Sequence, residues 1–261
     1  MADTVIGLAL GSGGAKGFAH IGVLRALEEH EIPIHVVTGS SMGSLVGALY
    51  VTGMRPRFME RLAASLHVRH WLDLGIPKVG LVAGEKVHEM LRLLTHHATF
   101  EELERPFACV ATDLLHRRKV ILKTGSVADA VRASISIPGV FVPVVTEEGV
   151  LVDGGVLDRV PVAAARQLGA DVVIGVDVAA VYRSRVPETV LDVVTMSIDV
   201  MQEHALRSSD NVPDVAIEPD VSDIGTSQFH RSAEAVAAGY QAAVASIPKI
   251  RAAIEAANAA P

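Results

Sequence analysis

Residues 34–53, IHVVTGSSMGSLVGALYVTG, decide the fold of this chain, because they join a buried strand to a helix through a glycine-rich turn. The β-branched apolar residues at the start of the stretch predict the strand, and the apolar residues from Met42 onward predict the helix. Between them, Gly39, Ser41 and Gly43 form a G-x-S-x-G motif in the strand–turn–helix setting that gives such a motif meaning. A sharp turn crowds the backbone, so glycine is needed on both sides and the central serine projects. The plainer alternative is a Ser/Gly helix cap, with Ser40 as the capping residue.

The same alternation of strand and helix continues along most of the chain. Apolar strands are expected at residues 5–10, 34–38, 107–112, 119–123, 150–152, 172–178 and 214–217. Helices are expected at residues 19–29, 42–53, 85–95, 127–133, 162–168, 189–206 and 232–244. Strands that are apolar throughout are covered on both faces, so the pattern predicts a three-layer α/β/α sandwich with a mainly parallel central sheet.

The composition limits the class of protein. The chain has 261 residues, of which half are hydrophobic and 20% are charged, enough apolar material for a substantial core. We expect one domain over residues 1–261, with the core motifs at 7–178 and a C-terminal helical segment at 188–258. The net charge of -7, the lack of a dense Lys/Arg block and an aromatic content of 4% argue against a nucleic-acid partner.

The segments associated with export and membrane insertion are not found. The first residues lack a secretory signal, and no run approaches the ~18 to 20 apolar residues that cross a bilayer. The only cysteine, Cys109, lies in an apolar strand and cannot form an intrachain disulfide. We therefore expect a soluble, cytoplasmic protein, in which a local patch could still touch a membrane surface transiently. Residues 66–84 fit the sheet poorly and are either a cap over a pocket or an ordinary loop.

A second glycine-rich segment, GSGGAKG at residues 11–17, also lies between a predicted strand and a predicted helix. Consecutive glycines let backbone N–H groups converge on one point and bind an anion. A G-x-x-x-x-G-K-[ST] phosphate loop fails because Gly17 follows Lys16, and a G-x-G-x-x-G dinucleotide loop fails because Lys16 holds the sixth place. An oxyanion hole needs only two or three free N–H groups, here those of Gly13 and Gly14.

Asp153, followed by two glycines, comes directly after a short predicted strand. By itself such a tripeptide is more often a turn or a helix cap. A serine hydroxyl needs a base, however, and the histidines beyond this point, His204 and His230, are weak candidates for a triad. His20 is more simply a structural residue. The direct alternative is a dyad in which Asp153 accepts the proton of Ser41, with partial burial raising its pKa.

These segments together resemble the patatin-like phospholipase family, specifically its compact bacterial members. A fourth block, RASISIPGVF at residues 132–141, is similar to the segment that precedes the family's aspartate. The resemblance implies a Ser41–Asp153 dyad without histidine, an oxyanion hole at Gly13 and Gly14, and hydrolysis of acyl esters of lipids. Elbow geometry adds the N–H of Met42 as a donor. The motif glycines are Gly11, Gly17, Gly39, Gly43, Gly154 and Gly155.

Several questions stay open at this level. We expect no metal and no organic cofactor, because the chain has no His/Cys cluster with ligand spacing. A regulatory or partner-binding relative with a vestigial site is the main alternative, although such a role would place no demand on Ser41 or Asp153. A nucleotide-binding module is a weaker one. The acyl chain, the head group and the oligomeric state cannot be read from the sequence.

Overall fold

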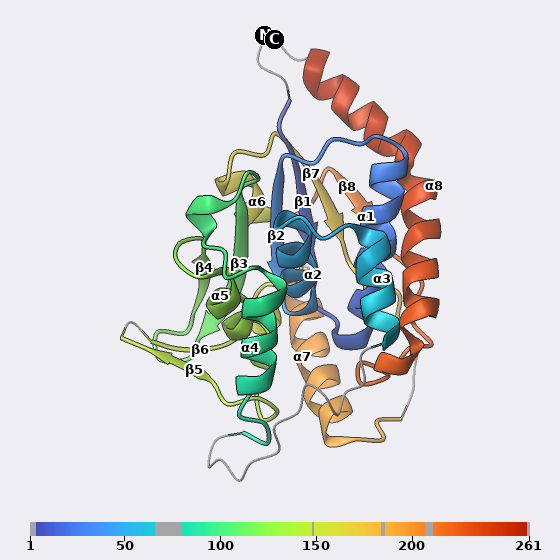
Figure 1. Cartoon of the computed structure of the whole chain (residues 1–261). Coiled ribbons are helices and arrows are strands. Elements are labelled where there is room, and N and C mark those ends of the chain that lie inside the picture. Colours follow the sequence, from blue (N-terminus) through green and yellow to red (C-terminus); the bar gives the residue numbers. More distant parts are fainter. Residues whose placement is uncertain (1–3, 66–79, 148, 184–185, 207–210, 260–261) are drawn as a thin grey trace.

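The computed structural model describes residues 4–65, 80–147, 149–183, 186–206 and 211–259 (Figure 1). Its centre is a sheet in which five strands run parallel, in the order β3-β2-β1-β7-β8. These strands are β1 (Ile6–Leu10), β2 (Val36–Ser40), β3 (Phe107–Asp113), β7 (Val172–Val176) and β8 (Val215–Ile217). The first four are buried along their whole length, which confirms the predicted parallel core.

The antiparallel part of the sheet is built around β3. It consists of β4 (Arg118–Leu122), β5 (Val144–Thr146) and β6 (Gly149–Asp153). Strand β4 pairs with residues 109–113 of β3 and so occupies one of its two edges. Strands β2 and β6 therefore share the other edge: β2 ends with Ser40 opposite Val110, and β6 ends with Asp153 opposite Ala111. The two strands approach each other head to head along β3.

Helices cover both faces of the sheet. In β1, Leu8 and Leu10 belong to the large core beneath α1 (Ala19–Glu29) and α2 (Met42–Val51), whereas Ala9 packs with residues around α6 (Val162–Gln167) on the other face. Alternate side chains of a strand point to opposite faces, so this division defines the predicted three layers. Figure 1 shows α3 (Pro56–Ser65) and α4 (Glu85–Leu94) outside α2, with α5 (Val127–Ser134) beside it, α8 (Ser232–Ala259) along α1, and α7 (Val190–Leu206) below the sheet.

The structure adds to the predicted elements at three places. Helix α3 was not predicted; it begins at Pro56, which suits a first helical turn, and it buries only Pro56, Met59 and Ala63. The short strand β5 was also missed. A helix was expected over residues 232–244, within a C-terminal helical segment at 188–258, and α8 runs without a break through Pro248 to Ala259. Proline inside a helix removes one backbone hydrogen bond, and the length of the contact with α1 outweighs that loss.

Three further expectations can be compared with the structure. Residues 66–84, expected to form a cap or an ordinary loop, fall largely on residues 66–79, which lie outside the described part of the chain. Among the described helices, none combines the length and the apolar character needed to cross a lipid bilayer. Cys109 is buried in β3 as expected, and its burial raises the pKa of the thiol.

Candidate active site

The pairing of β2 and β6 with β3 brings together a hydroxyl and a carboxyl that are 112 residues apart in the chain. Ser41 follows the last residue of β2, and Asp153 is the last residue of β6. The Ser41 Oγ donates a hydrogen bond to the Asp153 Oδ2 at 2.6 Å. Both residues are 95% buried, with 5% of their surface exposed. The short contact between two buried groups is the geometry that direct proton transfer requires.

The turn that carries Ser41 has a strained backbone. Ser41 has φ 53° and ψ -123°, a left-handed conformation that non-glycine residues rarely adopt. A Cβ at Gly43 would overlap the Leu10 carbonyl, and one at Gly39 would overlap the backbone of Ser44. The predicted need for both glycines is thus explained by crowding. The capping alternative is wrong: Ser40 belongs to β2, the residue that caps α2 is Ser41, and no side chain caps this helix.

The environment of Asp153 adjusts its acidity. Burial raises the pKa of Asp153 from its usual value near 3.8 to about 7, because a charge in an apolar interior loses its hydration. Hydrogen bonds from Ser41 and from the Gly155 N–H, at 2.7 Å to Oδ1, lower the pKa and oppose part of this effect. The pKa of Asp153 is raised overall, as the sequence analysis expected for a buried carboxyl. A carboxylate with a pKa near 7 can both accept and return a proton at neutral pH.

The glycine-rich loop lies against the same site. Its first two amides are used: Gly11 N–H donates to the Val176 carbonyl at 3.0 Å, and Ser12 N–H donates to the Arg159 carbonyl at 2.9 Å. Within the part of the chain that the structure describes, the next two amides, those of Gly13 and Gly14, have no hydrogen-bond acceptor. Gly14 has φ +55°, a backbone conformation that favours glycine.

A third amide without a hydrogen-bond acceptor is that of Met42, the residue after Ser41. Met42 is the first residue of α2, so its N–H has no partner within the helix, and none is found elsewhere in the described residues. It also carries part of the positive end of the helix dipole. The packing of Met42 against Gly17 keeps the two glycine-containing turns together, since a Cβ at Gly17 would overlap the Met42 side chain.

Two serines that sequence reasoning did not single out hold the site in place. Ser134 Oγ accepts a hydrogen bond from the Ser41 N–H at 3.0 Å and donates one to the Val110 carbonyl at 2.6 Å. The Ser136 carbonyl accepts the N–H of Asp153 at 2.9 Å. Both serines are fully buried. One segment therefore fixes the backbone of the serine and the backbone of the aspartate together.

Arg132 supports that segment from within the protein. Its guanidinium donates to the Ser136 Oγ at 2.6 Å, to the Ala83 carbonyl at 2.7 Å and to the Val142 carbonyl at 3.0 Å. It also lies 5.2 Å from the centre of the Phe141 ring. The signal that could have identified this role is an arginine flanked by apolar residues, Val131 and Ala133, since a buried guanidinium must be hydrogen-bonded.

The histidines take no part in the contact between Ser41 and Asp153. His20 is fully buried, its Nε2 donates to the Gly11 carbonyl at 2.7 Å, and burial lowers its pKa to about 4, so it is neutral and structural as expected. His230 lies exposed in a short turn of 3₁₀ helix at Phe229–Arg231. The side chain of His204 lies outside the described residues.

The fold and the site define a three-layer α/β/α protein with a serine at a strained strand–helix turn, hydrogen-bonded to a buried aspartate. Residues 8–166 match the family model described as patatin-like phospholipase, and the chain belongs to that family.

Relatives identified by sequence agree with this assignment. An uncharacterized NTE family protein of Mycobacterium tuberculosis is 41% identical over 174 residues, which are 66% of this chain and 48% of that protein. Lysophospholipase NTE1 of Pyricularia oryzae is 31% identical over 281 residues, covering 94% of this chain and 18% of the fungal protein. The chain thus spans about half the length of the mycobacterial relative and much less of the fungal one.

Two solved structures share the fold at low sequence identity. VipD from Legionella pneumophila has a TM-score of 0.63 at 15% identity, covering 96% of this chain and 67% of VipD. The type III effector protein ExoU has a TM-score of 0.52 at 15% identity, covering 97% of this chain and 54% of ExoU.

Proposed function

We propose that this protein is a serine acyl hydrolase that cleaves carboxylic esters of lipids, with Ser41 as the nucleophile and Asp153 as its base. The observation that carries the proposal is the 2.6 Å hydrogen bond from the Ser41 Oγ to the buried Asp153 carboxylate. The patatin-like phospholipase family and the lysophospholipase relatives support a lipid ester as the substrate class. No step needs a histidine.

The first step forms an acyl-enzyme. The Ser41 Oγ attacks the ester carbonyl carbon while its proton passes to the Asp153 Oδ2. The tetrahedral intermediate then collapses, the ester C–O bond breaks, and the alcohol leaves with the proton from Asp153. A pKa near 7 suits both halves of this step, because the same carboxyl must accept a proton and then return it.

The second step regenerates the enzyme. Asp153 accepts a proton from a water molecule, whose oxygen attacks the acyl carbonyl of the Ser41 ester. Collapse of this second intermediate breaks the bond to the Ser41 Oγ and releases the carboxylic acid. The serine recovers its proton from Asp153, so the enzyme ends as it began.

The oxyanion in both steps would be stabilised by the amides of Gly13, Gly14 and Met42. All three lack an acceptor among the described residues, so they are available to the negative charge that develops on the carbonyl oxygen. Donors of this kind contribute roughly 2.7 to 4 kcal/mol each to transition-state stabilisation. The N-terminus of α2 adds a favourable partial charge in the same place.

Contact with a lipid surface is a natural part of this proposal. Exposed apolar side chains follow the residues of the site: Leu157 comes four residues after Asp153, and Val190 and Val193 lie on α7, which packs near that segment. We expect the protein to sediment with zwitterionic lipid vesicles more than a Leu157→Ser, Val193→Ser double variant does. Equal sedimentation of the two proteins would remove this part of the proposal.

A fluorophosphonate probe tests the proposed chemistry directly, because it reacts only with an activated serine. We expect labelling of the wild-type protein and none of Ser41→Ala. Absence of labelling in a folded wild-type protein would favour the regulatory or partner-binding alternative. A panel of lysophospholipids, phospholipids, glycerides and thioesters would then identify the head group.

A further inference from the structure

Ser12, in the glycine-rich loop, has a buried hydroxyl to which the two proposed steps give no role. The residue is 9% exposed, and its backbone is fixed by the hydrogen bond from its N–H to the Arg159 carbonyl at 2.9 Å. Within the part of the chain that the structure describes, the Ser12 Oγ has no hydrogen-bond partner. Most buried hydroxyls have such a partner, so a free one calls for an explanation.

The Ser12 hydroxyl lies beside the base. A Cβ built on Gly155 would meet the Ser12 Oγ at 2.8 Å and the Asp153 Oδ1 at 2.9 Å. These two oxygens are therefore less than about 6 Å apart, and no direct hydrogen bond joins them. One water molecule with two hydrogen bonds of about 2.8 Å bridges oxygens at such a separation.

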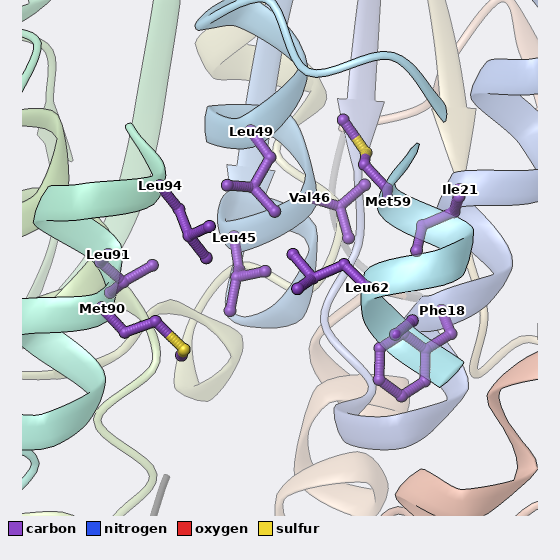
Figure 2. Close-up of a pocket in the computed structure, with 11 residues that line it drawn as sticks. Phe18, Ile21, Leu45, Val46, Leu49, Met59, Leu62, Met90, Leu91 and Leu94 are labelled. Carbon is purple, nitrogen blue, oxygen red and sulfur yellow. The ribbon is translucent and has the colours of Figure 1, made fainter. Parts of the chain in front are cut away.

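Gly155 keeps a side chain out of the space beside these oxygens. Its φ is not in the left-handed region, so its backbone conformation does not require glycine. The requirement is spatial, because a Cβ there would crowd both oxygens. The small apolar gap between α2, α3 and α4 differs in kind: its volume is about 20 Å³ and its lining is of apolar residues such as Leu45 and Leu91, which offer water no partner (Figure 2).

The Asp153 carboxylate has room for a further donor. Its Oδ2 accepts from the Ser41 Oγ and its Oδ1 accepts from the Gly155 N–H, and the described residues supply no third donor. An ionised carboxylate has about four lone-pair sites. In an acyl-enzyme the Ser41 Oγ is an ester oxygen without a proton, so Asp153 then loses that donor as well. A water molecule is the reactant that must approach Asp153 at this stage.

We propose that Ser12 holds the water molecule that hydrolyses the acyl-enzyme. The proposal rests on the proposed function, because it concerns the second step of that reaction. The water donates one hydrogen to the Asp153 carboxylate and the other to the Ser12 Oγ, which leaves a lone pair of its oxygen for the acyl carbon. Its oxygen bonds to that carbon, its proton passes to Asp153, and the bond to the Ser41 Oγ then breaks. Ser12 neither gains nor loses a proton.

The first test is a burst experiment with p-nitrophenyl butyrate, whose good leaving group makes acylation fast. In Ser12→Ala we expect acylation within about twofold of the wild-type rate and deacylation slower by about tenfold, because only the water loses a partner. The variant should release one p-nitrophenolate per enzyme rapidly and the rest slowly. In the steady state kcat and KM should fall together, with kcat/KM nearly unchanged.

Ser40→Ala is the matched control. The Ser40 Oγ is also buried without a partner among the described residues, but it lies against Gly154, 2.9 Å from where a Cβ of that glycine would stand. We expect Ser40→Ala to leave the ratio of acylation to deacylation rates unchanged. Thermal unfolding verifies that each variant is folded.

Two further measurements separate a held water from a packing role of Ser12. Hydroxylamine is a stronger nucleophile than water, so it should raise the turnover of Ser12→Ala by a larger factor than that of the wild type. Fluorophosphonate labelling needs no water, so Ser12→Ala should be labelled at nearly the wild-type rate. Ser12→Thr keeps the hydroxyl and, where it folds, should recover most of the deacylation rate.

The outcomes distinguish this inference from the proposed function. Equal deacylation rates in wild type and Ser12→Ala would make the inference wrong. A kcat/KM or a labelling rate that falls as far as kcat would also overturn it, because Ser12 would then support acylation through the loop that carries Gly13 and Gly14. Failure of the folded wild-type protein to react with the fluorophosphonate would instead overturn the proposed function, and this inference with it.

Discussion

Two arms of the molecule supply the two groups of the site, and they hold them by different means. The serine arm, residues 36–51, positions Ser41 by steric crowding around a strained turn between β2 and α2. The acid arm, residues 127–155, positions Asp153 at the end of an ordinary strand, where its N–H donates a hydrogen bond to the carbonyl of the buried Ser136. The serine arm is strained in its backbone, and the acid arm carries the cost of burying a charge.

This comparison shows that the nucleophile and the base need different kinds of support. A projecting nucleophile needs a fixed backbone, which short-range sterics can provide. A base with a raised pKa needs burial, which only residues from elsewhere in the chain can provide. Strand β3 is the common reference, because β2 and β6 end on the same edge of it, opposite Val110 and Ala111. The following experiments separate the two arms.

The largest effect is expected for the acid arm. Asp153→Asn removes the base and should lower kcat by about 10² to 10⁴-fold, the range that a general base supplies. The same variant should be more stable than the wild type at pH 8, by up to about 4 kcal/mol, because it removes a buried charge.

The sign of that stability difference follows from linkage. Folding raises the pKa of Asp153 from near 3.8 to about 7, so the protonated form favours the fold. Its contribution is fully present below about pH 4 and is lost as the pH rises through about 7. Urea unfolding of both proteins at pH 4 and pH 8 measures it. A stability gap that is no larger at pH 8 than at pH 4 would contradict the raised pKa.

The pH dependence of the wild-type reaction is the next largest effect. Only the deprotonated carboxyl can accept the proton of Ser41, so kcat/KM should fall about tenfold per pH unit below about pH 7. A pH–rate profile with a short-chain ester checks this. His230→Ala is the control, and we expect it to leave both the rate and the profile unchanged. If kcat/KM of His230→Ala no longer fell below about pH 7, a triad would be favoured over the dyad.

A smaller effect is expected where the two arms meet. Ser134→Ala removes the hydrogen bond from the Ser41 N–H at 3.0 Å and leaves that amide buried without its acceptor. We expect a fall in kcat of about tenfold, with KM nearly unchanged, because the nucleophile loses its fixed position. Ser134→Thr keeps the hydroxyl and should recover most of the activity if it folds. Equal losses in both variants would indicate a packing defect instead.

The smallest effect concerns the strain of the serine arm and appears only in stability. Ser41→Gly and Ser41→Ala both remove the nucleophile, but only glycine adopts φ 53° without steric cost. We expect Ser41→Gly to be more stable than Ser41→Ala by about 1 kcal/mol, and no more than about 3. Chemical denaturation of the two inactive proteins measures the difference. Equal stabilities would mean that the turn holds no strain at this residue.

Much of the parallel half of the fold could be predicted because its signals are local. Strand β1 and helix α1 lie where the apolar runs predicted them, and Gly39 and Gly43 marked the turn. The antiparallel half of the sheet was harder to predict from the sequence. Strand β5 has only three residues, two of them exposed, so it carries no apolar pattern to recognise.

The roles of Ser134, Ser136 and Arg132 in the acid arm could not be predicted from neighbouring residues in the sequence either. Ser134 and Ser136 lie in a segment whose resemblance to the family was evident, but a serine in a short helix gives no sign of the amide it will accept. Arg132 likewise acquires its three acceptors from residues up to 49 positions away. These contacts exist only after the chain has closed around β3.

The amino-acid sequence by itself determined the alternating layers, the glycine-bounded turn at Ser41 and the presence of a carboxylate after a strand, because periodicity and steric demand act over a few neighbouring residues. Only the tertiary structure decided that β2 and β6 meet end to end on one edge of β3 and that Asp153 is buried there with a pKa near 7. The physical reason is that strand register and burial depend on contacts between distant parts of the chain.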